Sequence, residues 1–440
     1  MISSSRRAFL RDACAGLGAL GSVGSIVGGL RAQEAARAEE PELPSLPSFD
    51  RAMEEHMGPR AIPGGALAVL RGGRLVHLRG YGKLDRDREE RVRATSLFRL
   101  ASLSKPITAI AVLRLVEAGR LALDEPILRY VALEPFLEEG ASEDPRWQRV
   151  TLRHCLQHSG GWDRGRSFDP MFRAVPFAHR LGRPAPASAH DVVRVMRGRA
   201  LDFDPGTRYA YSNFGYCLLG RAIESVAGTS YEEHVRTQVL VPLGAGAMRI
   251  GRSLPTQRAD GEVRYHLPPG HAEKRVDSAF PAAGERVPAP DGGFHLEAMD
   301  AHGGWIASAL DLARFLAALD RPAQPPLLAE DTRRMMQERP APPLGRDDRG
   351  VESETYYGLG WMVRPRKDRP ERANLWHSGS LPGTSTLMVR RHDGLSWVVL
   401  FNQRQESDEL PDGAIDAALH RAAATVEAWP SEDLFERCAR

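Results

Sequence analysis

Lysine and cysteine are both scarce in this sequence of 440 residues. Only four of its 59 basic residues are lysines, at positions 83, 105, 274 and 367. Arginine fills the other basic positions, so each lysine is a candidate for a role that needs a loss of charge, because a lysine can lose its proton inside a protein and an arginine cannot. The four cysteines, at positions 14, 155, 217 and 438, are widely spaced. This spacing argues against a disulfide framework and against a structural zinc site.

Two further features are absent, and each excludes a class of protein. The net charge is only +2, and no run of basic residues is interleaved with aromatic ones. Nucleic acid is therefore not expected as a partner. Beyond the first 30 residues, no stretch is long and apolar enough to span a bilayer, so we expect no stable membrane span in the mature chain.

The N-terminal residues have the pattern of an export signal. Ser5-Arg6-Arg7-Ala8-Phe9-Leu10 resembles the twin-arginine motif, and it precedes a weakly apolar stretch and a small-residue cleavage pattern at 36–38. We therefore predict a signal peptide at 1–38, an exposed lead-in at 39–47, and a periplasmic or secreted location in a bacterium.

Hydrophobic patterning places strands at both ends of the chain and helices between them. Apolar segments at 65–70 and 75–78 flank a glycine-containing turn, and segments at 386–390 and 395–401 flank an Asp-Gly turn. Residues 107–118 are apolar nearly all round, which is typical of a buried helix. We expect an α+β fold: an antiparallel sheet from both ends, flanked by helices, with a mainly helical region at about 107–300 inserted. Long loops are expected at 163–189 and 253–293.

Ser102 and Lys105 form the first candidate for catalysis, just before the apolar helix. A serine hydroxyl needs a neighbouring base to become a nucleophile, and three residues correspond to about one helical turn. Burial against the helix would lower the pKa of the lysine and make it a usable base. None of the other three lysines follows a serine at this spacing.

Two further segments carry residues that suit catalysis, although each pattern by itself is common. Tyr211-Ser212-Asn213 precedes a predicted helix; its tyrosine could move a proton and its amide could bind a carbonyl group. His377-Ser378-Gly379-Ser380 precedes the C-terminal hairpin. A glycine on an edge strand would let a substrate backbone approach and would expose an N–H to an oxyanion.

Together, in this order, the three segments resemble the signature of the serine β-lactamase and penicillin-binding-protein superfamily. The resemblance is to the branch that contains class C β-lactamases, esterases of β-lactamase fold and D-stereospecific peptidases. Collinear segments extend it over about 48–430, which predicts one domain of β-lactamase/transpeptidase-like fold followed by a tail at 431–440. Those segments are Leu123–Pro126, Leu152–Gly161, Gly303-Gly304-Trp305 and Tyr357–Trp361.

The resemblance also implies a role for each matching residue. Ser102 corresponds to the acylated nucleophile, Lys105 to the lysine that activates it, and Tyr211 to the tyrosine that relays a proton to the leaving group. Asn213, His377 and Gly379 correspond to substrate-binding positions. The backbone N–H groups of Ser102 and Ser380 correspond to the oxyanion hole.

One departure from the family pattern bears on the substrate. His377 stands where β-lactamases carry a lysine that pairs with the substrate carboxylate, and histidine offers less charge at neutral pH. We therefore expect a serine hydrolase that needs no cofactor and acts on small acyl esters or D-amino-acid peptides. The alternatives are a true β-lactamase, a DD-peptidase acting on cell-wall peptide, or a non-catalytic penicillin-binding-like sensor. The sequence leaves the oligomeric state open.

His154 and His158 form a competing pattern. Their spacing of four could place both side chains on one helix face as metal ligands. Neither an HExxH glutamate nor a third ligand accompanies them, and the two glycines after His158 fit the end of a helix. We expect no metal there.

Overall fold

The computed structural model describes residues 44–271, 274–280, 285–321, 326–344, 351–369, 372–405 and 411–438. The predicted export signal at 1–38 and the first residues of the predicted lead-in, 39–43, lie outside these ranges and stay predictions. Within the described ranges, no helix combines the length and the apolar character needed to cross a membrane.

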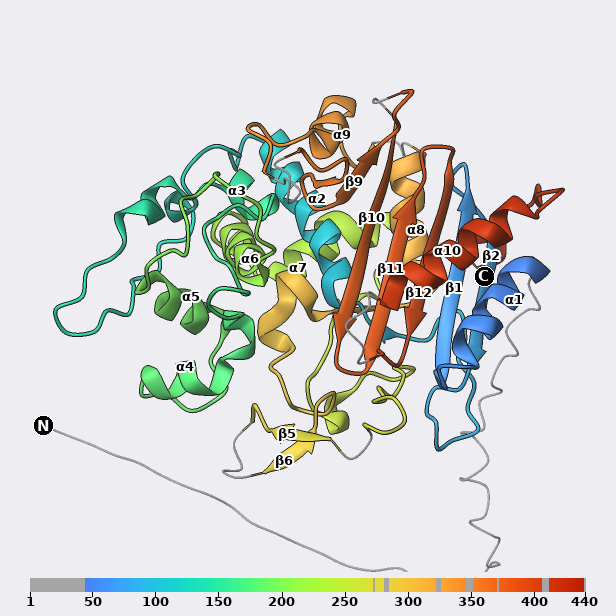
Figure 1. Ribbon diagram of the computed structural model, residues 1–440, viewed down its shortest axis with the longest axis horizontal. Coiled ribbons are helices and arrows are strands. Elements are labelled where there is room, and N and C mark those ends of the chain that lie inside the picture. The colour runs from blue at the N-terminus through green and yellow to red at the C-terminus, as the bar shows by residue number, and fades with distance from the viewer. Residues whose placement is uncertain are drawn as a thin grey trace, which may run out of the picture. The chain divides into compact units, whose positions relative to one another are not determined.

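A seven-stranded antiparallel sheet joins the two ends of the described chain, as predicted (Figure 1). Its order is β2-β1-β12-β11-β10-β9-β8, so that a strand from the N-terminal part lies beside a strand from the C-terminal part. The strands span Gly64–Arg71 (β1), Arg74–Gly82 (β2), Tyr356–Tyr357 (β8), Met362–Pro365 (β9), Ala373–Leu381 (β10), Thr384–Arg390 (β11) and Leu395–Phe401 (β12).

Both predicted hairpins are present. Gly72 and Gly73 both have positive φ, at 57° and 74°, which is what the two-residue turn between β1 and β2 requires. Gly394, also at positive φ, lies in the turn between β11 and β12. The turn chemistry therefore favours the pairing within each of the two hairpins, β1 with β2 and β11 with β12.

Alternating side chains of the sheet enter two different cores. On β1, Leu67 and Val69 pack on one side with α1 (Pro47–Met57) and α10 (Pro411–Ala424). Ala66, Ala68 and Leu70 face the other side and belong to a core that includes α2 (Ser104–Glu117) and α8 (Ala309–Asp320), of which α8 packs directly on β1. Both faces of the central strands are therefore buried, and Figure 1 shows α1 and α10 together on one face.

The inserted region is helical over a shorter span than predicted. In its described residues, the last α-helix ends at Val235, and a π-helical turn (Arg236–Leu240) and a 3₁₀ turn (Val241–Leu243) follow it. After residue 250 the sequence is rich in Pro and Gly, which favours short strands and turns over long helices. The first predicted long loop also contains a short helix, α4. The remaining helices are α3 (Leu152–Leu156), α4 (Ala174–Arg180), α5 (Ala189–Arg197), α6 (Asn213–Ala227), α7 (Tyr231–Val235), α9 (Glu330–Gln337) and α11 (Phe435–Cys438).

Short strands and the chain ends complete the fold. One small sheet pairs β3 (Phe98–Arg99), β7 (Trp305–Ala307) and β4 (Arg249–Ile250), and another pairs β5 (Arg275–Asp277) with β6 (Arg286–Pro288). Leu46 and Leu434 are both buried, and the Leu434 N–H donates to the Leu75 carbonyl at 2.9 Å. The fold therefore includes the end of the predicted lead-in and part of the predicted tail, because each supplies an apolar side chain.

Candidate active site

Ser102 lies in a tight turn that connects β3 to α2. The turn residue Ala101 has a φ of +49°, a left-handed conformation that is unfavourable for a residue with a Cβ and is often found at functional sites. A 3₁₀ turn spans Ala101–Leu103, and α2 begins at Ser104. The Ser102 side chain is therefore presented at the N-terminal end of a buried helix, where the helix dipole favours negative charge.

Lys105 is fully buried on the first turn of α2, and its Nζ has three oxygen neighbours. Nζ lies 3.0 Å from Ser102 Oγ, 2.8 Å from Asn213 Oδ1 and 3.0 Å from the carbonyl oxygen of His302. The predicted contact between the serine and the lysine is thus present, and it occurs within one helical turn.

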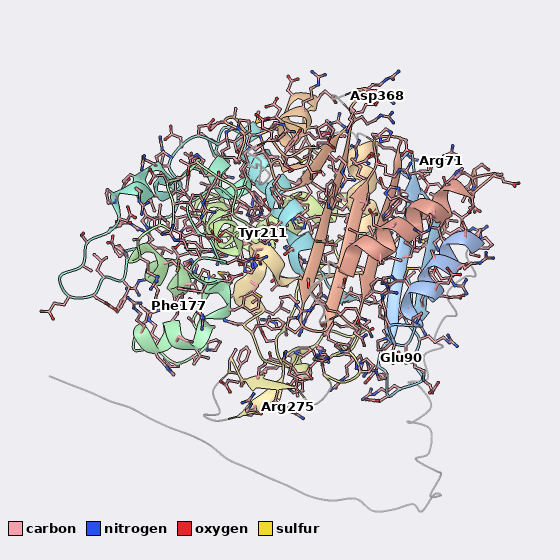
Figure 2. All side chains as sticks on the ribbon, in the orientation of Figure 1. Arg71, Glu90, Phe177, Tyr211, Arg275 and Asp368 are labelled. Atoms are coloured by element: carbon pink, nitrogen blue, oxygen red, sulfur yellow. The ribbon has the colours of Figure 1, made fainter. Side chains whose placement is uncertain are left out.

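Tyr211 and Asn213 reach the same point from the start of α6. The Tyr211 hydroxyl donates to Ser102 Oγ at 2.8 Å, and the Ser212 side chain caps the helix by accepting from the Gly215 N–H. Figure 2 labels Tyr211, which lies near the junction of the helical part and the sheet. The structure therefore brings Ser102, Lys105, Tyr211 and Asn213 into one hydrogen-bonded group.

Burial sets the protonation of this group. It lowers the pKa of Lys105 well below the usual lysine range, an effect that nearby Asp169 opposes and Arg164 reinforces. Burial also raises the pKa of Tyr211, whose phenol is therefore protonated at neutral pH. A neutral Lys105 that donates to Asn213 and to the His302 carbonyl has its lone pair free to accept the Ser102 proton.

Asp169 is a site residue that the sequence did not reveal. Its Oδ2 accepts a 2.6 Å hydrogen bond from Asn213 Nδ2, and its Oδ1 caps a short 3₁₀ turn by accepting from the Met171 N–H. Asp169 belongs to the first predicted long loop. An Asp-Pro pair predicts a turn there but gives no sign of a contact with Asn213, which lies 44 positions later.

His377 does not point a free nitrogen at Ser102. Its Nδ1 lies 2.6 Å from the Ser378 carbonyl, and its Nε2 lies 2.8 Å from the Tyr357 hydroxyl. Since the carbonyl can only accept, Nδ1 carries the proton and Nε2 accepts from Tyr357. Burial lowers the pKa of His377 to about 3, so the ring is neutral at pH 7, as the sequence suggested.

Gly379 allows β10 to approach the Ser102 turn. A Cβ at this position would lie 2.3 Å from the Leu100 carbonyl, 2.2 Å from Thr386 Oγ1 and 3.2 Å from the Ser102 nitrogen. The prediction of an edge strand holds only for part of β10, because β9 pairs with it from Ala373 to Trp376. Beyond Trp376, no described strand pairs with that side of β10, and the exposed Ser380 lies in this stretch.

His158 lies just beyond α3, which ends at Leu156, in keeping with the predicted helix end; it also packs against the site. Its ring centroid lies 4.3 Å from that of Tyr211 and 4.3 Å from that of Tyr357. Burial lowers its pKa well below the usual histidine range. Tyr209 and Tyr357 continue this aromatic cluster into a cavity of about 350 Å³, whose walls also include Leu344 and Met362.

The other candidate positions have structural contacts. His154 caps its own short helix: its Nδ1 accepts from the Thr151 N–H. The described residues contain no group of three or more His, Cys, Asp or Glu side chains that could hold a metal ion. Cys155 and Cys217 are buried free thiols.

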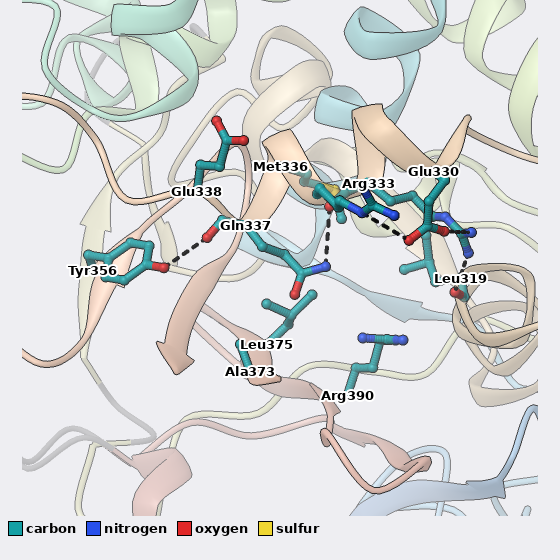
Figure 3. Close-up of a pocket in the computed structure, with 11 residues that line it drawn as sticks. Leu319, Glu330, Arg333, Met336, Gln337, Glu338, Tyr356, Ala373, Leu375 and Arg390 are labelled. Atoms are coloured by element: carbon teal, nitrogen blue, oxygen red, sulfur yellow. Dashed lines mark hydrogen bonds and ion pairs between the residues drawn. The ribbon is translucent and has the colours of Figure 1, made fainter. Parts of the chain in front are cut away.

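A larger cavity, of about 580 Å³, lies between α9 and β10 and has none of the site residues in its lining (Figure 3). Two of its polar contacts are internal: Arg333 pairs with Glu330, and the Tyr356 hydroxyl donates to the main-chain carbonyl of Gln337 at 2.8 Å. Its lining, as far as the structure describes it, includes no serine, cysteine, lysine or histidine. We therefore place the chemistry at Ser102.

Comparison with known proteins gives matches over most of the chain. The Beta-lactamase family model matches residues 49–422. Esterase EstB of Burkholderia gladioli is 30% identical over 390 residues, which span 82% of this chain and 91% of the esterase. Penicillin-binding protein 4* of Bacillus subtilis (strain 168) is 27% identical over 371 residues, spanning 83% of this chain and 74% of that protein.

Solved structures show the same fold. The D-amino acid amidase from Ochrobactrum anthropi SV3 aligns with 22% identity and a TM-score of 0.63, covering 86% of this chain and 99% of the amidase. The octameric penicillin-binding protein homologue from Pyrococcus abyssi aligns with 24% identity and a TM-score of 0.63, covering 86% of this chain and 77% of the homologue. The predicted α+β fold of β-lactamase/transpeptidase type is confirmed.

Proposed function

The chain belongs to the β-lactamase family and is a serine hydrolase, and we propose that it acts through an acyl-enzyme on Ser102. The observation that carries the proposal is the pair of hydrogen bonds at Ser102 Oγ, one with Lys105 Nζ at 3.0 Å and one from the Tyr211 hydroxyl at 2.8 Å. A base and a proton donor in contact with one serine are what nucleophilic catalysis requires.

The proposed reaction begins with neutral Lys105 taking the Ser102 proton as Oγ attacks the substrate carbonyl. The N–H groups of Ser102 and Ser380 stabilise the oxyanion that forms. The Tyr211 hydroxyl then gives its proton to the leaving alkoxide or amine, and the Lys105 ammonium restores it. Water then attacks the acyl carbonyl and passes a proton through Tyr211 to neutral Lys105. The Lys105 ammonium returns that proton to Ser102 Oγ as the acyl bond breaks and the acid leaves.

We propose small acyl esters or D-amino-acid peptides as substrates. His377 supplies no positive charge for a β-lactam carboxylate at this position, because its ring is neutral and both of its nitrogens have partners. The names of two relatives, an esterase and a D-amino acid amidase, point to the same two classes.

The test is hydrolysis of p-nitrophenyl butyrate and of a D-amino-acid p-nitroanilide by the wild-type chain and by Ser102→Ala. We expect turnover in the variant to fall on the order of a thousandfold or more, since loss of the nucleophile disables the whole catalytic unit. Ser142→Ala, at an exposed serine outside the site, is the matched control and should retain wild-type rates.

Three outcomes distinguish the alternatives. Equal hydrolysis by wild type and Ser102→Ala would refute the proposal. Slow-releasing labelling of Ser102 by a fluorescent penicillin, without ester turnover, would favour a penicillin-binding enzyme or sensor instead. Failure of Ser102 to react with a fluorophosphonate probe would favour a non-catalytic protein.

A further inference from the structure

Asp169 brings a carboxylate into direct contact with the hydrogen-bonded group around Ser102. Its Oδ2 lies 2.6 Å from Asn213 Nδ2, and Asn213 Oδ1 lies 2.8 Å from Lys105 Nζ. The chain of contacts therefore runs from the loop after α3, through the side-chain amide of Asn213, to the lysine beside the nucleophile.

The two partners of Asn213 fix the orientation of its amide. A carboxylate only accepts hydrogen bonds, so the Nδ2 end must face Asp169; the Oδ1 end then faces the N–H groups of Lys105. Resting on the proposed function, we propose that Asp169 is a positioning residue: it holds the Asn213 amide so that Oδ1 binds the Lys105 N–H groups and the lysine lone pair points at Ser102.

The electrostatic surroundings of Lys105 give Asp169 a second effect on the base. The charge of Asp169 raises the pKa of Lys105. Arg164 lowers the pKa of Lys105, and its guanidinium lies 4.9 Å from the Tyr211 ring centre. The other titratable groups around the lysine are uncharged at neutral pH. Burial lowers the pKa values of the histidines and raises those of the tyrosines: His158, His302, His377, Tyr211 and Tyr216.

Asp169→Asn separates positioning from folding. Asparagine is as good a helix cap as aspartate, so its oxygen can keep the bond from the Met171 N–H and preserve the loop. Its NH₂ group then faces Asn213 Nδ2, donor against donor, and the Asn213 amide must rotate or move away. We expect kcat for p-nitrophenyl butyrate at the pH plateau to fall tenfold or more, up to about a hundredfold, because small misplacements of catalytic groups have effects of this size.

A reciprocal exchange tests the contact itself. Asn213→Asp alone sets two carboxylates against each other, and it should be strongly impaired. In the double variant Asp169→Asn/Asn213→Asp, the amide introduced at position 169 can donate to the carboxylate introduced at position 213, whose other oxygen can accept from Lys105. We expect the double variant to be more active than Asn213→Asp. Its loss of activity should also be smaller than the product of the losses in the two single variants, which indicates a direct interaction.

The pH profile of kcat/KM supplies a readout that a merely structural role would not change. Loss of the Asp169 charge favours the neutral lysine, so the acidic limb in Asp169→Asn should move to lower pH, by on the order of one unit. In Arg164→Gln the acidic limb of kcat/KM should move to higher pH, because Arg164 lowers the pKa of Lys105. The double variant, with a carboxylate directly on Lys105, should also move to higher pH.

The outcomes separate this inference from the proposed function. Thermal unfolding first checks that each variant is folded. The inference is then overturned if Asp169→Asn has the wild-type kcat at the pH plateau and the wild-type acidic limb in kcat/KM. It is also overturned if the loss of activity in the double variant equals the product of the two single losses. Full activity in Ser102→Ala would instead refute the acyl-enzyme itself. An inactive Ser102→Ala beside unaltered Asp169 variants would refute only the positioning role.

Discussion

The ring and the hydroxyl of Tyr211 have different roles in the site. Its ring packs against His158, with the ring centres 4.3 Å apart, while its hydroxyl donates to Ser102 Oγ. Burial raises the pKa of this phenol, so at neutral pH it is a proton donor and not a phenolate base. In the resting site Lys105 is therefore the better candidate for the base, and Tyr211 for the group that protonates the leaving group.

Removing the hydroxyl of Tyr211 should accordingly affect chemistry and leave the fold intact. We expect Tyr211→Phe to lower kcat for a D-amino-acid p-nitroanilide, whose leaving amine must be protonated, by about 10²- to 10⁴-fold, the range typical of a lost general acid or base, with little change in the melting temperature. Tyr130→Phe, which removes a hydroxyl that accepts from the Ala122 N–H, is the control and should retain activity. Unchanged kcat in Tyr211→Phe would exclude the proton-relay role.

At the scale of elements, the site depends on how closely β10 packs against the Ser102 turn. The Thr386 hydroxyl of β11 donates to the Leu100 carbonyl at 2.8 Å, and a Cβ added at Gly379 of β10 would lie 2.3 Å from the same carbonyl oxygen. A methyl group at position 379 has no room, since the nearest neighbours include rigid backbone.

Gly379→Ala should therefore displace β10 from Ser102 and spoil the oxyanion hole. We expect kcat/KM to fall about a hundredfold or more, because a shift of about an ångström is enough for such a loss. Gly413→Ala in α10 is the matched control: no atom lies within 4 Å of its added Cβ, so activity should be unchanged and stability equal or slightly higher. Wild-type kinetics in Gly379→Ala would show that the close approach is not required.

The elements also show which parts of the site could be predicted. The contact between Ser102 and Lys105 follows from helical spacing alone. The contact between Tyr211 and Ser102 joins segments 109 positions apart, and only the family resemblance predicted it. The bond between His377 and Tyr357 depends on how β8, β9 and β10 pair, and the bond from Asn213 to Asp169 depends on the path of an irregular loop; neither has a periodic signal in the sequence.

At the scale of the whole molecule, the buried histidines should make folding stability depend on pH. Burial lowers the pKa of His77 to about 4 and that of His377 to about 3, and it lowers those of His158 and His302 well below the usual range. In the unfolded chain these side chains titrate near 6.5. Below that pH the unfolded state binds more protons than the folded state, so stability is complete above pH 6.5 and is lost progressively as the pH falls towards 4.

Urea unfolding at pH 7.5 and at pH 5.5 measures this loss. Each fully buried histidine contributes up to about 1.4 kcal/mol per pH unit between the two pKa values. His77→Gln should reduce the pH-dependent difference, although it lowers stability at pH 7.5 by weakening contacts with the Leu46 N–H and the Tyr81 hydroxyl. His271→Gln, at an exposed histidine, is the surface control. A difference that His77→Gln does not reduce would contradict the assignment. Since the acidic limb of catalysis reports Lys105 only while the chain is folded, this measurement also sets the lowest pH at which that limb can be interpreted.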